Sequence, residues 1–106
     1  MSIPDLKGLF ETAQRIQSEV ARVREELARK TVVGETGGGL CRCTVNGKGE
    51  VLSITLEETI LGDKKMIEDL VVGAVNLALT RARETAESDL SQVTGGLPLP
   101  PGLFGG

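Results

Sequence analysis

The most constraining feature of this sequence is a regular apolar repeat close to its start. Apolar residues recur at alternating steps of four and three, the spacing that places them along one side of an α-helix or coiled coil. Helix-favouring Glu, Gln, Arg and Ala fill most of the positions between them. The pattern predicts a helix over residues 5–30. Its apolar seam consists of Leu9, Ala13, Ile16, Val20, Val23 and Leu27.

The length of this helix has consequences for assembly. A helix of about 25 residues is roughly 37 Å long, whereas a compact domain of about 100 residues has a radius of gyration of only about 13 Å. In a chain of 106 residues the helix should therefore overhang its own sheet, leaving its apolar seam in water. A second chain would cover it, so we expect a two-fold symmetric homodimer. The alternative is that this helix folds back on the last helix as a hairpin across the sheet.

The middle of the chain predicts a small antiparallel sheet. Three β-prone runs cover residues 31–33, 40–45 and 51–56, and Gly37-Gly38-Gly39 separates the first from the second. Asn46-Gly47-Lys48-Gly49 favours a hairpin between the second and the third, because Asn and Gly tolerate positive φ. In the last run Leu52, Ile54 and Leu56 alternate with Ser53 and Thr55, so these apolar side chains are expected on one face.

A second helix is predicted over residues 63–92, with Asp63 as its N-cap and Gly95 and Gly96 ending it. The fold class is therefore α+β, in the order helix, three-stranded antiparallel sheet, helix. Residues 1–94 are expected to form a single domain. Residues 95–106 form a Gly/Pro-rich tail that is either extended and docked or disordered.

Composition excludes several classes of function. The chain has 40% hydrophobic residues, two Phe, and no His, Trp or Tyr. The lack of His removes the commonest general base and metal ligand. The scarcity of aromatic residues argues against base stacking on single-stranded nucleic acid, which relies on exposed rings. No signal peptide or apolar stretch of about 20 residues is present, so we expect a cytoplasmic protein with no membrane partner.

Candidate chemical sites are few. Cys41 and Cys43 lack the further ligands a zinc site needs, so they are interpreted as small buried apolar residues. The glycines of residues 34–39 lack the Lys-Ser/Thr that completes a phosphate-binding loop and lead into a strand. No nucleophile has an identifiable activating base. We therefore expect no catalytic residue, no metal, no cofactor and no small-molecule substrate, and conclude that the chain is not an enzyme.

Basic residues are the most suggestive functional feature. Arg15, Arg22 and Arg29 recur every seven residues and should form one stripe along the first helix, offset from the seam. Further cations lie near this stripe or on the second helix: Arg24, Lys30, Arg81 and Arg83. Such side chains contact DNA phosphates. The net charge is −3, however, and a mixed-charge solvated helix face is the alternative.

The order of elements and several motifs resemble the YbaB/EbfC family of bacterial nucleoid-associated proteins. The likeness spans nearly the whole chain. It includes Gln14 and Gln17 in the opening helix, GETGGGL (34–40), TVNGKGEV (44–51), DKKMIEDLV (63–71), AVN (74–76) and the GLPLPPGL tail (96–103). The chain departs from the family where Cys41 and Cys43 replace typical Val residues, and where Arg replaces Lys or Gln along the first helix.

This resemblance implies a homodimer whose helices project from a shared β-core like tweezers. It also implies duplex DNA binding with low or modest sequence selectivity, association with the nucleoid, and an influence on nucleoid organisation and gene expression. The family's DNA contacts are attributed to the projecting helices, which points here to Arg15, Arg22, Arg24, Arg29 and Lys30, and further to Arg81 and Arg83. A protein-interaction adaptor acting through the helices and the Pro-rich tail is the alternative function.

Overall fold

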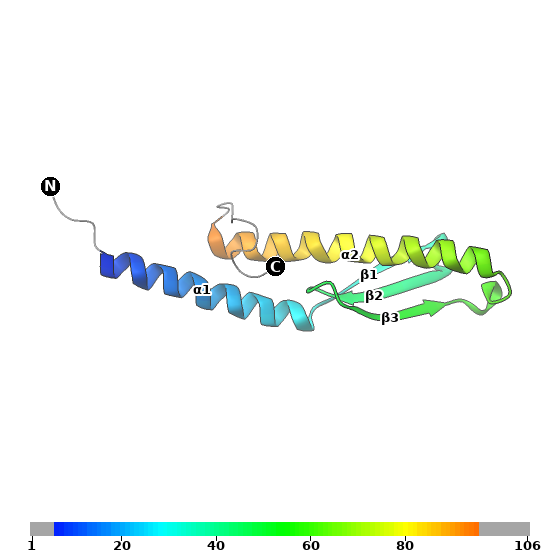
Figure 1. Cartoon of the computed structure of the whole chain (residues 1–106), viewed down its shortest axis with the longest axis horizontal. Coiled ribbons are helices and arrows are strands. Elements are labelled where there is room, and N and C mark those ends of the chain that lie inside the picture. The colour runs from blue at the N-terminus through cyan, green and yellow to red at the C-terminus, as the bar shows by residue number, and fades with distance from the viewer. Residues whose placement is uncertain (1–5, 96–106) are drawn as a thin grey trace.

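The computed structural model describes residues 6–95, which form two long helices and a three-stranded sheet in the order helix, sheet, helix (Figure 1). The predicted α+β class is therefore confirmed. The predicted tail, from residue 96 onward, lies outside the described residues. The elements are α1 (Leu6–Arg29), β1 (Thr31–Thr36), β2 (Cys41–Asn46), β3 (Val51–Leu56) and α2 (Lys64–Thr94), with short 3₁₀ turns at Gly37–Gly39 and Glu58–Ile60.

The helix bounds follow local signals. The Asp63 side chain accepts a hydrogen bond from the Met66 amide at 3.1 Å, which satisfies a donor that the first turn of α2 leaves free. Gly95, with φ 67°, ends α2 in the left-handed conformation that glycine adopts without strain. Both caps occupy the positions that the sequence predicts, although α2 ends two residues later than expected.

The sheet has the order β1-β2-β3 with both pairs antiparallel. Strand β1 is longer than predicted and continues through Gly34 and Glu35 to Thr36. The cause is tertiary. An added Cβ at Gly34 would lie 2.5 Å from the Ala74 carbonyl oxygen, so only glycine lets α2 approach this closely. The Thr36 hydroxyl then donates a hydrogen bond of 2.7 Å to the Leu70 carbonyl of α2.

The core lies between one face of the sheet and α2. Its members are small, which allows the helix to sit close over β1 and β2. They are Cys41, Cys43 and Val45 from β2, with Ala74, Ala78 and Ala82 from α2. Both cysteines are free thiols with fully buried side chains. The interpretation of Cys41 and Cys43 as buried apolar residues is confirmed.

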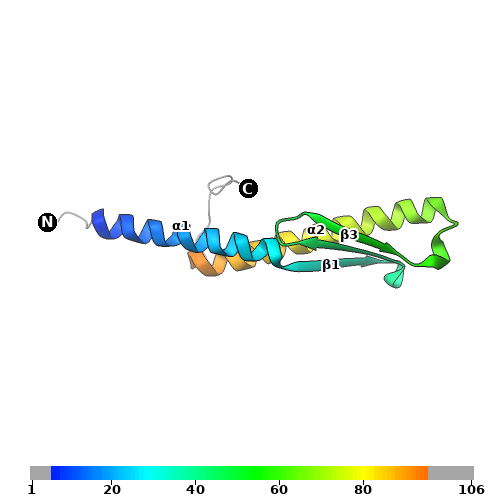
Figure 2. The same cartoon turned by 90° about the horizontal axis from the view of Figure 1, so that it is seen from below.

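Helix α1 is covered along only half of its length. Its C-terminal half packs beside the C-terminal half of α2, where Val20, Val23 and Leu27 are buried (Figures 1 and 2). Its N-terminal half continues past the end of α2. The hairpin alternative is therefore correct in that the second half of the seam packs against α2, but α1 extends away from the sheet and does not cross it. The first half of the seam overhangs, as expected. The expectation that a second chain covers the whole seam was wrong for Val20, Val23 and Leu27, which α2 of the same chain already buries.

The β2–β3 hairpin fixes the point where α1 meets the sheet. The Gly47 amide donates to the carbonyls of Leu27 at 2.8 Å and Lys30 at 2.9 Å, which satisfies carbonyls at the end of α1. The buried Asn46 side chain accepts from the amides of Lys48 and Glu50, each at 3.0 Å, and donates to the Glu50 carboxylate at 2.7 Å. The predicted Asn-Gly turn therefore also anchors a helix.

Strand β3 is left largely uncovered. Ile54 and Leu56 lie opposite the buried Cys43 and Cys41, but α2 is centred over β1 and β2, and Ile54 remains 42% exposed. A register shift between Thr44 and Val45 places Val51 opposite Val45 and leaves Leu52 without a partner in the pairing. The expected alternation is therefore correct at Ile54 and Leu56 and is interrupted at Leu52.

Candidate nucleic-acid interface

The predicted basic stripe on α1 lies on its exposed surface. Arg15, Arg22 and Arg29 are all exposed, and their seven-residue spacing keeps them on one side of the helix, away from the buried Val23 and Leu27. At a rise of about 1.5 Å per residue the three side chains span roughly 21 Å of α1. They differ sharply in their surroundings.

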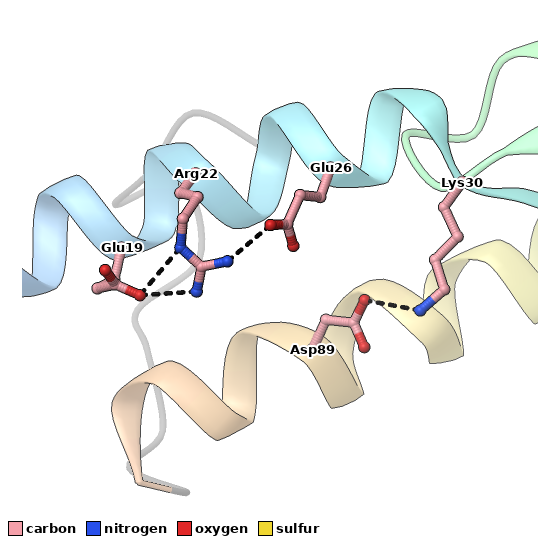
Figure 3. Close-up of polar contacts among 5 residues, drawn as sticks. All are labelled: Glu19, Arg22, Glu26, Lys30 and Asp89. Carbon is pink, nitrogen blue, oxygen red and sulfur yellow. Dashed lines mark hydrogen bonds and ion pairs between the residues drawn. The ribbon is translucent and has the colours of Figure 1, made fainter.

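Arg22 is already bound by two carboxylates. Its guanidinium contacts Glu19 at 2.7 Å and Glu26 at 2.7 Å, one turn before and one turn after it (Figure 3). The hydrogen bonds that Arg22 donates, to Glu19 first and then to Glu26, raise the pKa of Arg22 above its usual value. The three side chains together carry a net charge of −1, which repels a phosphate that approaches this part of the stripe.

Lys30 is also engaged, by a residue far away in sequence. Its ammonium group lies 3.1 Å from the Asp89 carboxylate of α2, so this pair links the end of α1 to the second helix (Figure 3). Lys30 and Asp89 line the same groove between the helices as Arg22, Glu19 and Glu26. The charged residues of this groove are three acids and two bases, so the groove itself is not a basic surface.

The two arginines of α2 do not act together. A separation of two residues places Arg81 and Arg83 about 200° apart around the helix. The Arg81 guanidinium donates a 2.7 Å hydrogen bond to the Val33 carbonyl of β1. Arg83 instead lines a hollow beside the hairpin, with Lys48 as a second cation on its rim. Lys48 was missed because its nearness to Arg83 depends on how the hairpin packs against α2.

The remaining predicted cations are more available. Within residues 6–95, the side chains of Arg15, Arg29 and Arg83 form no ion pair, and all three are exposed. Arg24 is partly buried and makes an interaction of its own. The structure therefore divides the seven predicted residues by availability, with Arg15, Arg29 and Arg83 best placed to receive a phosphate.

Other chemistry finds no support in the described part of the chain. Residues 6–95 contain no cluster of three or more His, Cys, Asp or Glu side chains able to hold a metal ion. Burial raises the pKa of the Cys43 thiol, and the neighbouring Cys41 adds to this rise. An activated cysteine nucleophile has a lowered pKa, so Cys43 does not fit that role. Neither described helix combines the length and the apolar character that crossing a membrane requires.

Comparison with known proteins identifies close relatives. The chain matches the model of the YbaB/EbfC DNA-binding family over residues 1–97. It is 38% identical over 98 residues to a nucleoid-associated protein of Desulfotalea psychrophila, covering 91% of this chain and 92% of that protein. It is 39% identical over 97 residues to a nucleoid-associated protein of Chlorobium phaeobacteroides, covering 92% of this chain and 87% of that protein.

The fold also occurs among solved structures. The crystal structure of an uncharacterized protein from Helicobacter pylori superposes with a TM-score of 0.72 and 21% sequence identity. The match covers 90% of this chain and 99% of that protein. At this level of identity the likeness concerns the fold alone, and it agrees with the helix–sheet–helix order derived above.

Proposed function

The chain belongs to the YbaB/EbfC DNA-binding family, which is not a family of enzymes, and on that premise we propose that it acts as a homodimer that binds duplex DNA at the nucleoid with low or modest sequence selectivity. The nucleoid location is supported by the names of its relatives. The single observation that carries the DNA-contact proposal is the row of exposed arginines on a helix that extends beyond its own domain. DNA is the only partner besides a second copy that the proposal requires.

Phosphate contacts are the proposed mode of binding. Arg15, Arg29 and Arg83 would make the first contacts, since no described carboxylate neutralises them. Arg22 and Lys30 would bind phosphates next, each by breaking its ion pair with a carboxylate and forming one with a phosphate. Exposed ion pairs contribute only about 0.2–1 kcal/mol, so this exchange costs little. Contacts to phosphates hold a protein on the duplex without reading its bases, which accounts for low sequence selectivity.

The homodimer is supported by the uncovered side of the sheet. Val51 and Ile54 of β3 lie on the core face, opposite buried residues of β2, yet they are 45% and 42% exposed. β3 is also an edge of the sheet, and an exposed apolar edge strand is a site for association with another chain. A second copy packed against β3 would bury this face and double the number of arginines that meet one duplex.

Salt dependence tests the proposal directly. Binding of a duplex by fluorescence titration at about 50 and 200 mM salt should weaken steeply, because each phosphate contact releases counterions. Two duplexes of unrelated sequence should bind within a small factor of each other. Absence of binding at the lower salt concentration, or an affinity that salt leaves unchanged, would overturn the proposal.

A matched set of variants locates the contacts. Replacing Arg15 and Arg29 together by Glu should weaken binding strongly, while Lys64→Glu with Lys65→Glu, the same charge change on exposed cations at the N-terminus of α2, should weaken it less. Sedimentation of each variant checks that assembly is intact. Equal losses for both changes would mean that bulk charge and not α1 determines binding.

A further inference from the structure

The N-terminal half of α1 carries an apolar surface that no other described element covers. Leu6, Leu9 and Phe10 are 60%, 60% and 70% exposed. Together with Ala13 they occupy positions i, i+3, i+4 and i+7, so the four side chains share one face of the helix. We call these four residues the tip surface. A contiguous apolar patch of this kind marks a contact site, because water penalises its exposure.

The C-terminus of α2 points toward this surface. α2 runs antiparallel to α1 and ends beside the middle of it, where Gln92 and Val93 line the same groove as Glu19 (Figures 1 and 2). Gly95 then stops the helix, with its amide donating to the Ser91 carbonyl. α2 therefore ends at the border between the covered and the uncovered half of α1.

The chemistry of residues 96–106 matches the tip surface. This segment has no charged residue and contains four large apolar side chains, Leu97, Leu99, Leu103 and Phe104. Pro98, Pro100 and Pro101 fix their own backbone angles, which lowers the entropy lost when the segment becomes ordered. An extended chain at about 3.1 Å per residue covers roughly 34 Å in these residues. The distance from the middle of α1 to Leu6 is only about 17 Å at the helical rise.

We propose that residues 96–106 fold back on the tip surface of their own chain's α1. The tether makes this contact intramolecular, at an effective concentration in the millimolar range, so even a weak apolar contact is populated. The segment would cover the apolar half of the overhanging helix and leave the Arg15 stripe, on another face, open to solvent. This contact depends neither on DNA binding nor on the dimer.

Fluorescence gives a direct readout, since the chain has no Trp or Tyr. A Phe10→Trp substitution places a single indole on the tip surface of the full-length protein. Replacing the four apolar tail residues by Ser in this background should shift its emission to the red and increase its quenching by acrylamide. In the chain with Phe10 retained, the same tail change should lower hydrogen-exchange protection of residues 6–16 by about tenfold. This is the effect expected when the lost contact had lowered the local opening equilibrium by a factor of about ten.

A control variant and a mixing experiment show whether the tip surface is covered by the tail of the same chain or by the tail of a second copy. Replacing Gly102 and Gly105 by Ser alters the same segment but keeps its apolar side chains, and should leave both signals unchanged. Adding a chain with an intact tail to the indole-bearing chain whose tail is polar should not restore the blue emission. Restoration would assign the surface to the tail of a second copy and overturn the proposal. The proposal would also be overturned if neither the indole emission nor the hydrogen-exchange protection of residues 6–16 changed when the tail residues were replaced by Ser.

Discussion

At the residue scale, the close approach of α2 to the sheet depends on glycine. A Cβ at Gly34 would lie 2.5 Å from the Ala74 carbonyl oxygen and 2.6 Å from the Ala78 amide nitrogen. Both are backbone atoms of α2, so they cannot rotate away as a side chain would. We expect Gly34→Ala to push α2 off β1 and to lower the free energy of unfolding by about 1–3 kcal/mol. Urea denaturation measures this loss.

The matched control is Gly62→Ala, since a Cβ at Gly62 would meet no atom within 4 Å and its backbone is not in the left-handed region. This variant should unfold within about 0.5 kcal/mol of the original protein. Equal destabilisation of both variants would show that the effect belongs to glycine replacement in general and not to the contact between Gly34 and α2.

Cys43 gives the protein a pH-dependent stability in the alkaline range. Burial raises the pKa of its thiol in the folded chain above the ordinary value of 9.0. Above that pH the unfolded chain loses this proton while the folded chain retains it, so stability must fall as pH rises. Urea denaturation between pH 8 and pH 10 should show a steeper loss of stability in the original protein than in Cys43→Ala. Parallel curves would mean that the thiol ionises equally easily in both states.

At the scale of elements, the orientation of α1 depends on the β2–β3 hairpin. Asn46→Ala would leave the Lys48 and Glu50 amides without their 3.0 Å acceptor and loosen the turn whose Gly47 amide caps α1. Each of the two hydrogen bonds lost contributes about 0.5–1.5 kcal/mol, so together they are worth about 1–3 kcal/mol. We expect a loss of stability in that range together with faster amide exchange over residues 20–29. The exposed Lys48→Ala in the same turn is the control and should change neither measurement.

The same scale explains which parts of the fold the sequence predicts. Both helices are found nearly to the residue because their signals are local: the apolar repeat, the Asp63 cap and Gly95. The end of β1 is missed because Gly34 and Glu35 have low strand propensity, and only contact with α2 makes them a strand. The division of the apolar seam is missed for the same reason, since Val20, Val23 and Leu27 are buried by a helix distant in sequence.

The candidate site follows this rule as well. The contact between Arg22 and Glu26 is expected from their four-residue spacing, and Glu19 lies within one turn. The pair of Lys30 and Asp89 joins residues 59 positions apart, so no local pattern could indicate it. The separation of Arg81 from Arg83 is predictable from helical geometry, but the partners of each, Val33 and the hairpin, are not.

The carboxylates beside Arg22 give a prediction about affinity. Glu19→Gln with Glu26→Gln changes the net charge of this cluster from −1 to +1 and frees the guanidinium for a phosphate. If α1 meets DNA along the Arg15 stripe, this variant should bind duplex DNA more tightly and with a steeper salt dependence. Glu57→Gln with Glu58→Gln, at the far end of β3, makes the same charge change as a control. An equal gain in both would attribute the effect to net charge alone.

At the scale of the whole molecule, the single chain is elongated, with a radius of gyration of 19.5 Å. Its strand β3 lies at the edge of the sheet and is exposed. If a second copy covers this face, Ile54→Asp should place a charge in the interface and yield a monomer by sedimentation equilibrium. The monomer offers half as many cations to one duplex. Because the slope of log affinity against log salt is about −0.9 per phosphate contact, that slope should fall to about half.

Ser53→Asp is the matched control for this experiment, since Ser53 lies on the same strand, is also exposed, and pairs with Thr44 on the opposite face of the sheet. It adds the same charge and should remain dimeric with the full salt slope. A dimer that survives Ile54→Asp would place the interface elsewhere. A monomer that keeps the full slope would show that one chain supplies every phosphate contact, which separates the question of assembly from that of DNA binding.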